Sequence, residues 1–341
     1  MTGWRDVSAV LVGSVVLVAA CSSSSRSSTV TTPTTGTTVA KTASTAAAST
    51  DAASTVAAST NDTTTTTTVP SRVAATGRAC GNSGRVPERY RSVVVFAFEN
   101  RTWNDVGGVG FGAMPYLHRL AQQCAYFSDW SETDTNQDSL TQYVGQLTGA
   151  FQSGTVNDCA PSPSCSTQAD NLFRQARNAR LTAINYVEGT TSACSSEGNA
   201  AKHIPALYMW GAIDRSYCQA QVRPLSEFDP NRLPSFAFVT PTLCDDGHDC
   251  ANATVDGWAK THIQPVLDSG AYHAGQVAVF VWYDEYQPVP NMWITPTATP
   301  GAVTAAGAGY AGTLRAWESM LGLPCLADAC TAPNMRTAAH S

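Results

Sequence analysis

The stretch Ser92–Asn100, with the sequence Ser-Val-Val-Val-Phe-Ala-Phe-Glu-Asn, decides the fold class. The six residues after the serine are apolar, and three of them are β-branched. Such an uninterrupted run predicts a strand buried on both faces, as parallel strands are inside an α/β sheet. The strand ends at Glu99 and Asn100, whose oxygen atoms would lie at the carboxyl edge of the sheet, where open α/β folds bind ligands.

A second apolar run, Val277–Trp282, repeats this pattern further along the chain. It is followed closely by two carboxylates, Asp284 and Glu285. Because the carboxyl ends of parallel strands meet at one edge of a sheet, the two runs would bring their oxygen atoms together. The pair of strands therefore predicts a metal-assisted site. Its oxygen-rich composition favours a hard divalent ion over zinc, although iron or manganese would also fit.

Helical and extended patterns alternate along the rest of the chain. Apolar residues recur at three- and four-residue spacing in some segments, and shorter β-rich segments lie between them. We expect helices at 114–124, 140–147, 171–179, 258–267 and 314–321, strands at 124–130, 181–187 and 235–241, and a proline-rich loop at 287–301. The alternation predicts an α/β fold class: a single doubly wound, mostly parallel sheet flanked by helices.

The N-terminus has the features of an export signal. Residues 1–20 carry a basic residue near the start and a largely apolar run that is too short to span a bilayer comfortably. The run ends in Leu-Val-Ala-Ala before Cys21, which resembles the bacterial lipobox, so we expect Cys21 to be lipidated. An ordinary signal peptide cut nearby is the alternative. If Cys21 is lipidated, we expect the exported protein to be anchored by this lipid to the outer face of the bacterial cell membrane.

Composition separates a linker from a domain. Residues 21–77 consist mostly of Ser, Thr, Ala and Val, which predicts a disordered linker. Residues 78–341 remain for one sizeable α/β domain. The net charge is −6, only 13% of residues are charged, and no run of Lys or Arg occurs, which argues against nucleic acid as a partner.

Ten cysteines follow Cys21. An even number in an exported chain predicts disulfides. Local spacing favours four pairs and leaves a fifth: Cys159–Cys165, Cys194–Cys218, Cys244–Cys250, Cys325–Cys330 and Cys80–Cys124. A zinc cluster is the alternative, but the chain has no CxxC pair to support it.

Ser139 follows the segment Asp134–Asp138, which is rich in acidic and amide side chains, and opens the helix expected at 140–147. One interpretation is a helix cap, since serine is favoured there. The other is a nucleophile at a helix N-terminus, where free N–H groups and the helix dipole favour an anion such as phosphate. The local pattern leaves both interpretations open.

Two loops carry histidines. His203 lies in the loop-like segment Ala201–Pro205 and is uninformative by itself. The segment Cys244–Cys250 holds His248 among several aspartates, a composition that suits a metal or phosphate site. The alternative is a polar surface turn, and an EF-hand is disfavoured because its twelve-residue spacing is absent.

Together these residues resemble a known family. From about Arg91 to Pro324 the chain is similar to the bacterial phosphoesterases that include secreted acid phosphatases and phospholipases C, within the alkaline-phosphatase-like superfamily. The matching pieces are Phe98–Thr102, Ser139 and Leu140 with Tyr143, Thr148 and Gly149, Lys202–Pro205, Leu233 and Pro234, Pro241, Asp246–Asp249, Asp256–Trp258, Trp282 with Asp284 and Glu285, and Glu318 with Gly322–Pro324. Only their combination, in this order, is specific.

The resemblance implies an alkaline-phosphatase-like fold and a metal site. The cofactor would be a divalent metal ion of unknown identity. Its ligands would be Glu99, Asn100, Ser139, Asp284 and Glu285.

The resemblance also implies catalytic and substrate-binding roles. Ser139 would be the nucleophile, its hydroxyl on the metal and so more easily deprotonated. His203 and His248 would bind phosphate oxygens or protonate the leaving group. Asp246 is a further substrate-binding candidate, and Asp249 is a weaker one.

Three departures from the family pattern concern the pocket. Gln137 and Asp138 stand where family members commonly carry His-Pro, and Gln142 stands where they tend to have Asn. Tyr310 and Ala311 replace a His-Tyr pair. Asp138 would disfavour an anionic substrate close by. The departures imply altered substrate preference, slower turnover or loss of activity.

The leading hypothesis is a cell-surface phosphoric-ester hydrolase with a serine nucleophile, a phosphomonoesterase of the acid phosphatase type. Its substrate would be a phosphorylated small molecule or lipid, and the membrane would be a partner through Cys21. One alternative is a phospholipase C-like phosphodiesterase. Another is a catalytically impaired surface lipoprotein that binds phosphorylated ligands. A sulfatase-like esterase is weaker, because Ser139 lacks the Cys/Ser-x-Pro-x-Arg context.

Overall fold

Strand β1 (Ser92–Phe98) lies inside the sheet with all seven residues buried, as its apolar run predicts. It pairs in parallel with β5 (Phe236–Thr240) on one side and with β6 (Val277–Tyr283) on the other. The computed structural model describes residues 77–107, 112–128, 130, 132–133, 138–211, 213–303 and 309–340.

Eight strands form one sheet in the order β4-β3-β5-β1-β6-β7-β2-β8. Strand β7 is antiparallel to both of its neighbours, and the other pairings are parallel. The expected mostly parallel sheet is therefore confirmed. The remaining strands are β2 (Ala125–Phe127), β3 (Ala183–Val187), β4 (Val222–Pro224), β7 (Met292–Ile294) and β8 (Gly301–Val303).

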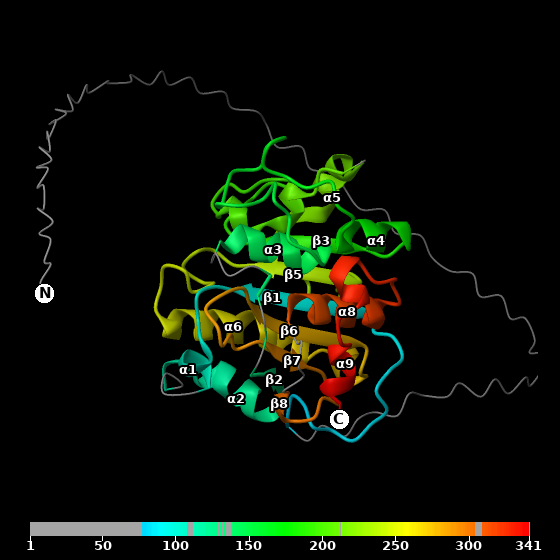
Figure 1. Ribbon diagram of the computed structural model, residues 1–341. Helices are drawn as coiled ribbons and strands as arrows, with labels where there is room; N and C mark the ends of the chain where they lie inside the picture. Colours follow the sequence, from blue (N-terminus) through cyan, green and yellow to red (C-terminus); the bar gives the residue numbers. More distant parts are fainter. Residues whose placement is uncertain are drawn as a thin grey trace, which may run out of the picture. The chain divides into compact units, whose positions relative to one another are not determined.

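Helices cover both faces of the sheet (Figure 1). Helices α3, α4 and α8 pack together in one layer, and α2, α6 and α7 pack together in the other. The helices are α1 (Trp103–Val106), α2 (Pro115–Gln123), α3 (Ser139–Thr148), α4 (Leu172–Asn178), α5 (Cys218–Gln221), α6 (Asn252–Leu267), α7 (Gly270–His273), α8 (Tyr310–Leu321) and α9 (Met335–Ala338).

Aromatic contacts on opposite faces explain why the central strands are apolar throughout. Phe98 of β1 packs edge-on against Trp258 of α6. Phe238 of β5 packs edge-on against Tyr143 of α3, in the other layer. Because alternate side chains of a strand point to opposite faces, covering both faces requires apolar residues at every position.

Two expectations for secondary structure are wrong. The segment 287–301 is not only loop, because it contains β7, which Asn291 supports by accepting a hydrogen bond from the Tyr283 N–H. The helix expected at 258–267 begins earlier, at Asn252. In its first six residues the only buried apolar side chain is that of Val255, so they lack the apolar periodicity that marks a helix in a sequence.

All five expected cysteine pairs form disulfides. Cys80–Cys124 ties the segment before β1 to the end of α2, across 44 residues. The other four close loops of 5 to 24 residues. The zinc-cluster alternative is therefore wrong for these ten cysteines.

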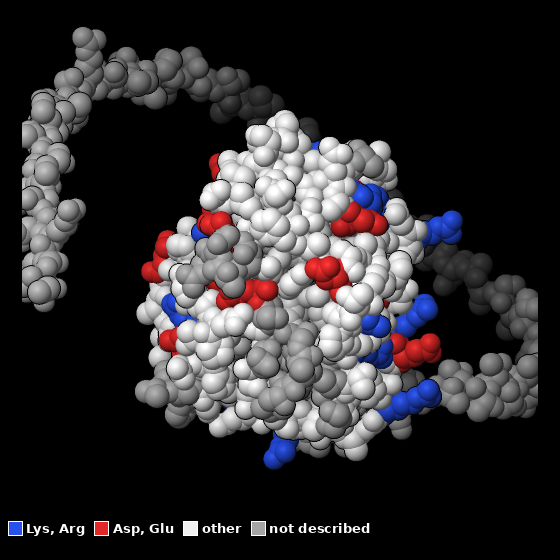
Figure 2. Space-filling model, in the orientation of Figure 1, with Lys and Arg blue, Asp and Glu red and all other residues white. Residues whose placement is uncertain are grey.

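The expected signal peptide, Cys21 and all but the last residue of the expected linker lie outside the described residues. Within the described ranges, no helix has the length and apolar character needed to cross a membrane. Charged side chains are sparse on the face shown in Figure 2, in keeping with a chain of which only 13% is charged.

Candidate active site

The carboxyl ends of β1 and β6 bring three carboxylates together. The two strands pair along their whole length, with Phe98 opposite Tyr283, so the residues that follow them leave the sheet at the same level. Ligand atoms of Glu99, Asp284 and Glu285 lie within 4.8 Å of one another, and all three side chains are buried. We call these three residues the acidic cluster.

Several oxygen atoms at this edge are buried without a hydrogen-bond partner in the described part of the chain. They are both carboxylate oxygens of Asp284, Oε2 of Glu285 and Oδ1 of Asn100. Leaving a buried charge uncompensated costs on the order of several kcal/mol, so a cation would stabilise these atoms. The oxygen donors of the acidic cluster and Asn100 therefore fit a divalent metal ion.

Burial raises the pKa of all three carboxyls in the acidic cluster. The pKa of Glu99 and of Asp284 lies well above the ordinary value, because burial disfavours the anion and a neighbouring carboxylate repels it. The same two causes raise the pKa of Glu285 to about 8. The carboxyls thus resist ionisation unless a cation compensates their charge.

Ser139 is the first residue of α3 and is almost fully buried. Its hydroxyl donates a hydrogen bond to Oε2 of Glu99 over 3.1 Å. Asp138 is the N-cap of this helix, so the interpretation of Ser139 as a helix cap is wrong. The serine lies where the helix N-terminus meets the acidic cluster.

His203 lies between two carboxylates and is fully buried. Its Nδ1 is 3.1 Å from Oδ2 of Asp246, and its Nε2 is 3.3 Å from Oε1 of Glu99. The second contact lacks the alignment of a hydrogen bond. Tyr143 stacks on the imidazole ring with 5.2 Å between ring centroids. These contacts fix the orientation of the ring.

His248 lies in the loop that the Cys244–Cys250 disulfide closes. Its backbone N–H donates to Oδ1 of Asp246 over 2.8 Å, and its ring Nδ1 is 2.7 Å from Oδ1 of Asp249. The side chain is 32% exposed, so this histidine, unlike His203, reaches solvent. Asp249 contacts the His248 ring and is itself exposed.

Lys202 is a candidate to which sequence reasoning assigned no role. Its Nζ lies 3.4 Å from Oγ of Ser139, 2.9 Å from Oδ2 of Asp158 and 3.5 Å from Nε2 of His248. Burial lowers the pKa of Lys202, but Asp158 and the more distant carboxylates of Glu99 and Asp284 together raise it above its ordinary value, so the side chain is an ammonium at neutral pH. Its position next to His203 in the Lys-His-Ile-Pro segment is the signal that points to it.

The residues that depart from the family pattern have other partners. Gln137 lies outside the described residues. Three of the others form hydrogen bonds with residues that the sequence did not connect with the site: Asp138 with Asn157, Gln142 with Thr133, and Tyr310 with Asp328.

Gly247 sets how closely the Cys244–Cys250 loop approaches β1. It has a φ of +108°, and a Cβ atom there would lie 2.9 Å from the backbone oxygen of Glu99. We expect Gly247→Ala to lower the free energy of unfolding by about 1–3 kcal/mol, because it adds backbone strain and pushes the loop off the strand end. Urea denaturation measures this.

Gly257→Ala is the matched control. Gly257 is exposed in α6, and a Cβ atom there would meet nothing within 4 Å. Alanine should therefore stabilise the helix by about 0.5–1 kcal/mol. Similar stabilities for the two variants would contradict the close approach at Gly247.

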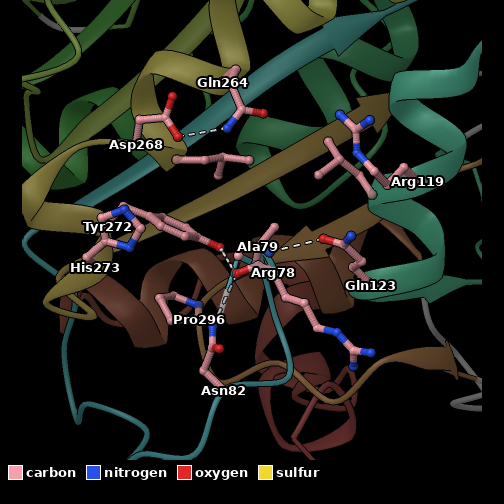
Figure 3. Close-up of a pocket in the computed structure, with 13 residues that line it drawn as sticks. Arg78, Ala79, Asn82, Arg119, Gln123, Gln264, Asp268, Tyr272, His273 and Pro296 are labelled. Carbon is pink, nitrogen blue, oxygen red and sulfur yellow. Dashed lines mark hydrogen bonds between the residues drawn. The ribbon is translucent and has the colours of Figure 1, made fainter. Parts of the chain in front are cut away.

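A hollow of about 280 Å³ lies elsewhere, beside the α7 helix that precedes β6 (Figure 3). Part of its polar lining is already paired: the Ala79 N–H donates to Gln123, and the Tyr272 hydroxyl donates to the Ala79 carbonyl. Figure 3 shows these side chains converging on the segment Arg78–Asn82. We interpret the hollow as the place where this segment is fastened to the domain.

Comparison with solved structures identifies the fold. A protein in the alkaline phosphatase superfamily from Vibrio parahaemolyticus has a TM-score of 0.51 and 12% sequence identity, over 73% of this chain and 70% of that chain. The fold is that of the alkaline phosphatase superfamily. Ps i-CgsB is similar as well, with a TM-score of 0.50 and 9% identity over 73% of this chain and 76% of that chain. The alkaline-phosphatase-like fold expected from the sequence is therefore confirmed.

Sequence comparison adds one short match. A stretch of 88 residues is 26% identical to a probable acid phosphatase of Kluyveromyces lactis, which amounts to 25% of this chain and 21% of that protein. The chain thus spans about a fifth of the length of this curated relative. No protein-family model matches the chain.

Proposed function

We propose that this protein is a metal-dependent phosphoric-ester hydrolase of the acid phosphatase type, with Ser139 as its nucleophile. The position of the Ser139 hydroxyl at the start of α3 carries this proposal. The hydroxyl donates a hydrogen bond to Glu99, and its oxygen lies 3.4 Å from the Lys202 ammonium nitrogen. A nucleophilic hydroxyl needs an acceptor for its proton, and a phosphoryl group needs cationic and N–H donors. The short similarity to a probable acid phosphatase supports the same class of reaction.

Glu99, Asn100, Asp284 and Glu285 would hold the divalent ion, with the Ser139 hydroxyl as a further ligand. When bound, the ion would lower the pKa of the serine hydroxyl and neutralise charge on the phosphoryl group. Its carboxylate and amide donors suit a hard cation such as magnesium or manganese.

The side chains of this chain would divide the reaction among them. The Ser139 hydroxyl loses its proton towards Glu99 while its oxygen attacks phosphorus, and the bond from phosphorus to the departing alcohol breaks. Lys202 compensates the charge of the phosphoryl oxygens. His248, which reaches solvent, donates a proton to the departing oxygen, and the buried His203 binds a phosphoryl oxygen. Water then attacks phosphorus and gives a proton to His248, while the bond from phosphorus to the Ser139 oxygen breaks, this oxygen takes back its proton from Glu99, and phosphate is released.

Metal removal tests the proposal. The oxidised, purified protein should hydrolyse p-nitrophenyl phosphate between acid and neutral pH. Dialysis against a chelator should reduce turnover by at least about 100-fold, because four buried oxygen donors lose the cation between them. Adding back magnesium or manganese should restore turnover.

Two results would contradict this function. Hydrolysis that survives complete removal of the metal would exclude a metal-dependent serine. Absence of hydrolysis with every divalent ion, in a folded protein that still binds inorganic phosphate, would favour the alternative of a surface lipoprotein that binds phosphorylated ligands.

A further inference from the structure

Asp158 occupies two donors that lie close to Ser139 in the structure. Its Oδ1 accepts the N–H of Leu140, the second residue of α3, over 3.0 Å. Its Oδ2 pairs with Nζ of Lys202 at 2.9 Å. Leu140 follows Ser139 directly in the chain, and Nζ of Lys202 lies 3.4 Å from the Ser139 Oγ. A phosphoryl group on that oxygen would need the same two donors.

The loop that carries Asp158 is built to hold it there. Asn157 and Asp158 have φ angles of 57° and 48°, a left-handed conformation that costs free energy but that Asn and Asp tolerate better than most residues. The next residue, Cys159, is tied by a disulfide to Cys165, and its carbonyl accepts the Tyr208 hydroxyl over 2.8 Å. The carboxylate is therefore pre-positioned.

Solvent can nevertheless reach this ion pair. The Asp158 side chain is 31% exposed and the Lys202 side chain is 20% exposed. An incoming phosphate can therefore reach the donors from solvent, and it must compete with the carboxylate for them.

We propose that Asp158 is a specificity residue: an internal anion that weakens the binding of doubly charged phosphate esters more than that of singly charged ones. The physical basis is like-charge repulsion next to the phosphoryl position, which acts about twice as strongly on a dianion as on a monoanion. The inference rests on the proposed function for its substrates, but its central claim concerns binding of an anion and can be measured without turnover.

The test uses inorganic phosphate as the probe at pH 8, where it is mainly the dianion. Titration calorimetry on the full-length, metal-loaded protein would compare the natural chain with Asp158→Asn, which keeps an acceptor for the Leu140 N–H and removes the charge. We expect phosphate to bind on the order of tenfold more tightly to the variant. Asp158→Gly, which suits the φ of 48°, should show the same gain and guards against a folding defect of the first variant.

Asp268→Asn is the matched control, because it removes the same charge from an exposed position beside the hollow of Figure 3. Its phosphate affinity should equal that of the natural chain. Unchanged or weaker binding in both Asp158 variants would overturn the inference, and so would absence of phosphate binding in all proteins.

Turnover separates this inference from the proposed function. In Asp158→Asn the ratio of kcat/KM for p-nitrophenyl phosphate to that for bis(p-nitrophenyl) phosphate should rise by about threefold or more. If all proteins hydrolyse neither ester, the proposed function fails, while the phosphate titration still decides the role of Asp158. An unchanged ratio in an active enzyme would contradict the discrimination by Asp158 between doubly and singly charged esters.

Discussion

Replacing Ser139 by alanine is expected to reduce p-nitrophenyl phosphate hydrolysis by roughly 10,000-fold or more, because no other hydroxyl could replace an oxygen that forms the covalent intermediate. The fold should survive, since Ser139 is the first residue of α3 and its N-cap, Asp138, is unchanged. Steady-state kinetics measures the loss. Incubation with radiolabelled substrate and acid quenching should label the natural chain and leave Ser139→Ala unlabelled.

Ser92→Ala is the control for this substitution. Ser92 is equally buried and begins β1, at the end of the strand away from the acidic cluster. Its hydroxyl has no hydrogen-bond partner among the described residues. Turnover in this variant should match the natural chain. Substantial activity in Ser139→Ala would show that the nucleophile is another group, such as a water molecule.

Replacing Asp284 by asparagine is expected to have opposite effects on activity and on stability. Turnover should fall by at least about 100-fold, because the variant lacks a carboxylate that would hold the metal. In metal-free protein at pH 8, the melting temperature should rise by several degrees, because asparagine removes one of three buried carboxyls whose raised pKa values destabilise the folded state at that pH. Calorimetry with a chelator present measures the shift.

The pH dependence of this effect has a defined sign. In the unfolded chain the three carboxyls titrate near about 4, whereas burial and mutual repulsion raise their folded pKa values, that of Glu285 to about 8. Between these values the folded state binds more protons than the unfolded state, so metal-free protein loses stability as pH rises from about 4 to 8. The stabilisation by Asp284→Asn should therefore be large at pH 8 and small at pH 4.

Asp256→Asn is expected to change stability in the opposite direction from Asp284→Asn. This carboxylate is also buried, but it accepts the N–H groups of Tyr116 and Leu117 at the start of α2. Its replacement should lower the free energy of unfolding by about 1 kcal/mol, because asparagine offers one acceptor oxygen in place of two. Equal destabilisation of the Asp256 and Asp284 variants would mean that the acidic cluster is not under repulsion.

The sequence predicted the parts of the site that follow directly from strands. Glu99 and Asp284 stand at fixed positions after two apolar runs, so the geometry of a parallel sheet was enough to bring them together. The disulfides were predictable for a similar reason, since four of them close short loops. In both cases a local sequence pattern, combined with the geometry of a parallel sheet or of a short loop, was enough to predict which residues are in contact.

The parts that the sequence missed depend on contacts between loops. Lys202 and Asp158 are 44 residues apart, and each lies in a segment without periodicity, so nothing in the local pattern shows that they form an ion pair beside Ser139. The short strand β7 escaped prediction because it has three residues and is held by pairing with its neighbours rather than by its own composition.

The direction of β1 has a practical consequence for handling the protein. The strand begins near the segment where the described chain starts, and it ends at Glu99, beside the acidic cluster. The segment Arg78–Asn82 borders the hollow of Figure 3 beside α7, which leads into the start of β6. A purification tag, a fusion partner or a solid support joined before Gly77 is therefore attached at the edge of the sheet opposite Ser139. Coupling through this end would leave the carboxyl edge of the sheet accessible, whereas coupling through the Lys202 amine would place the attachment 3.4 Å from the Ser139 hydroxyl.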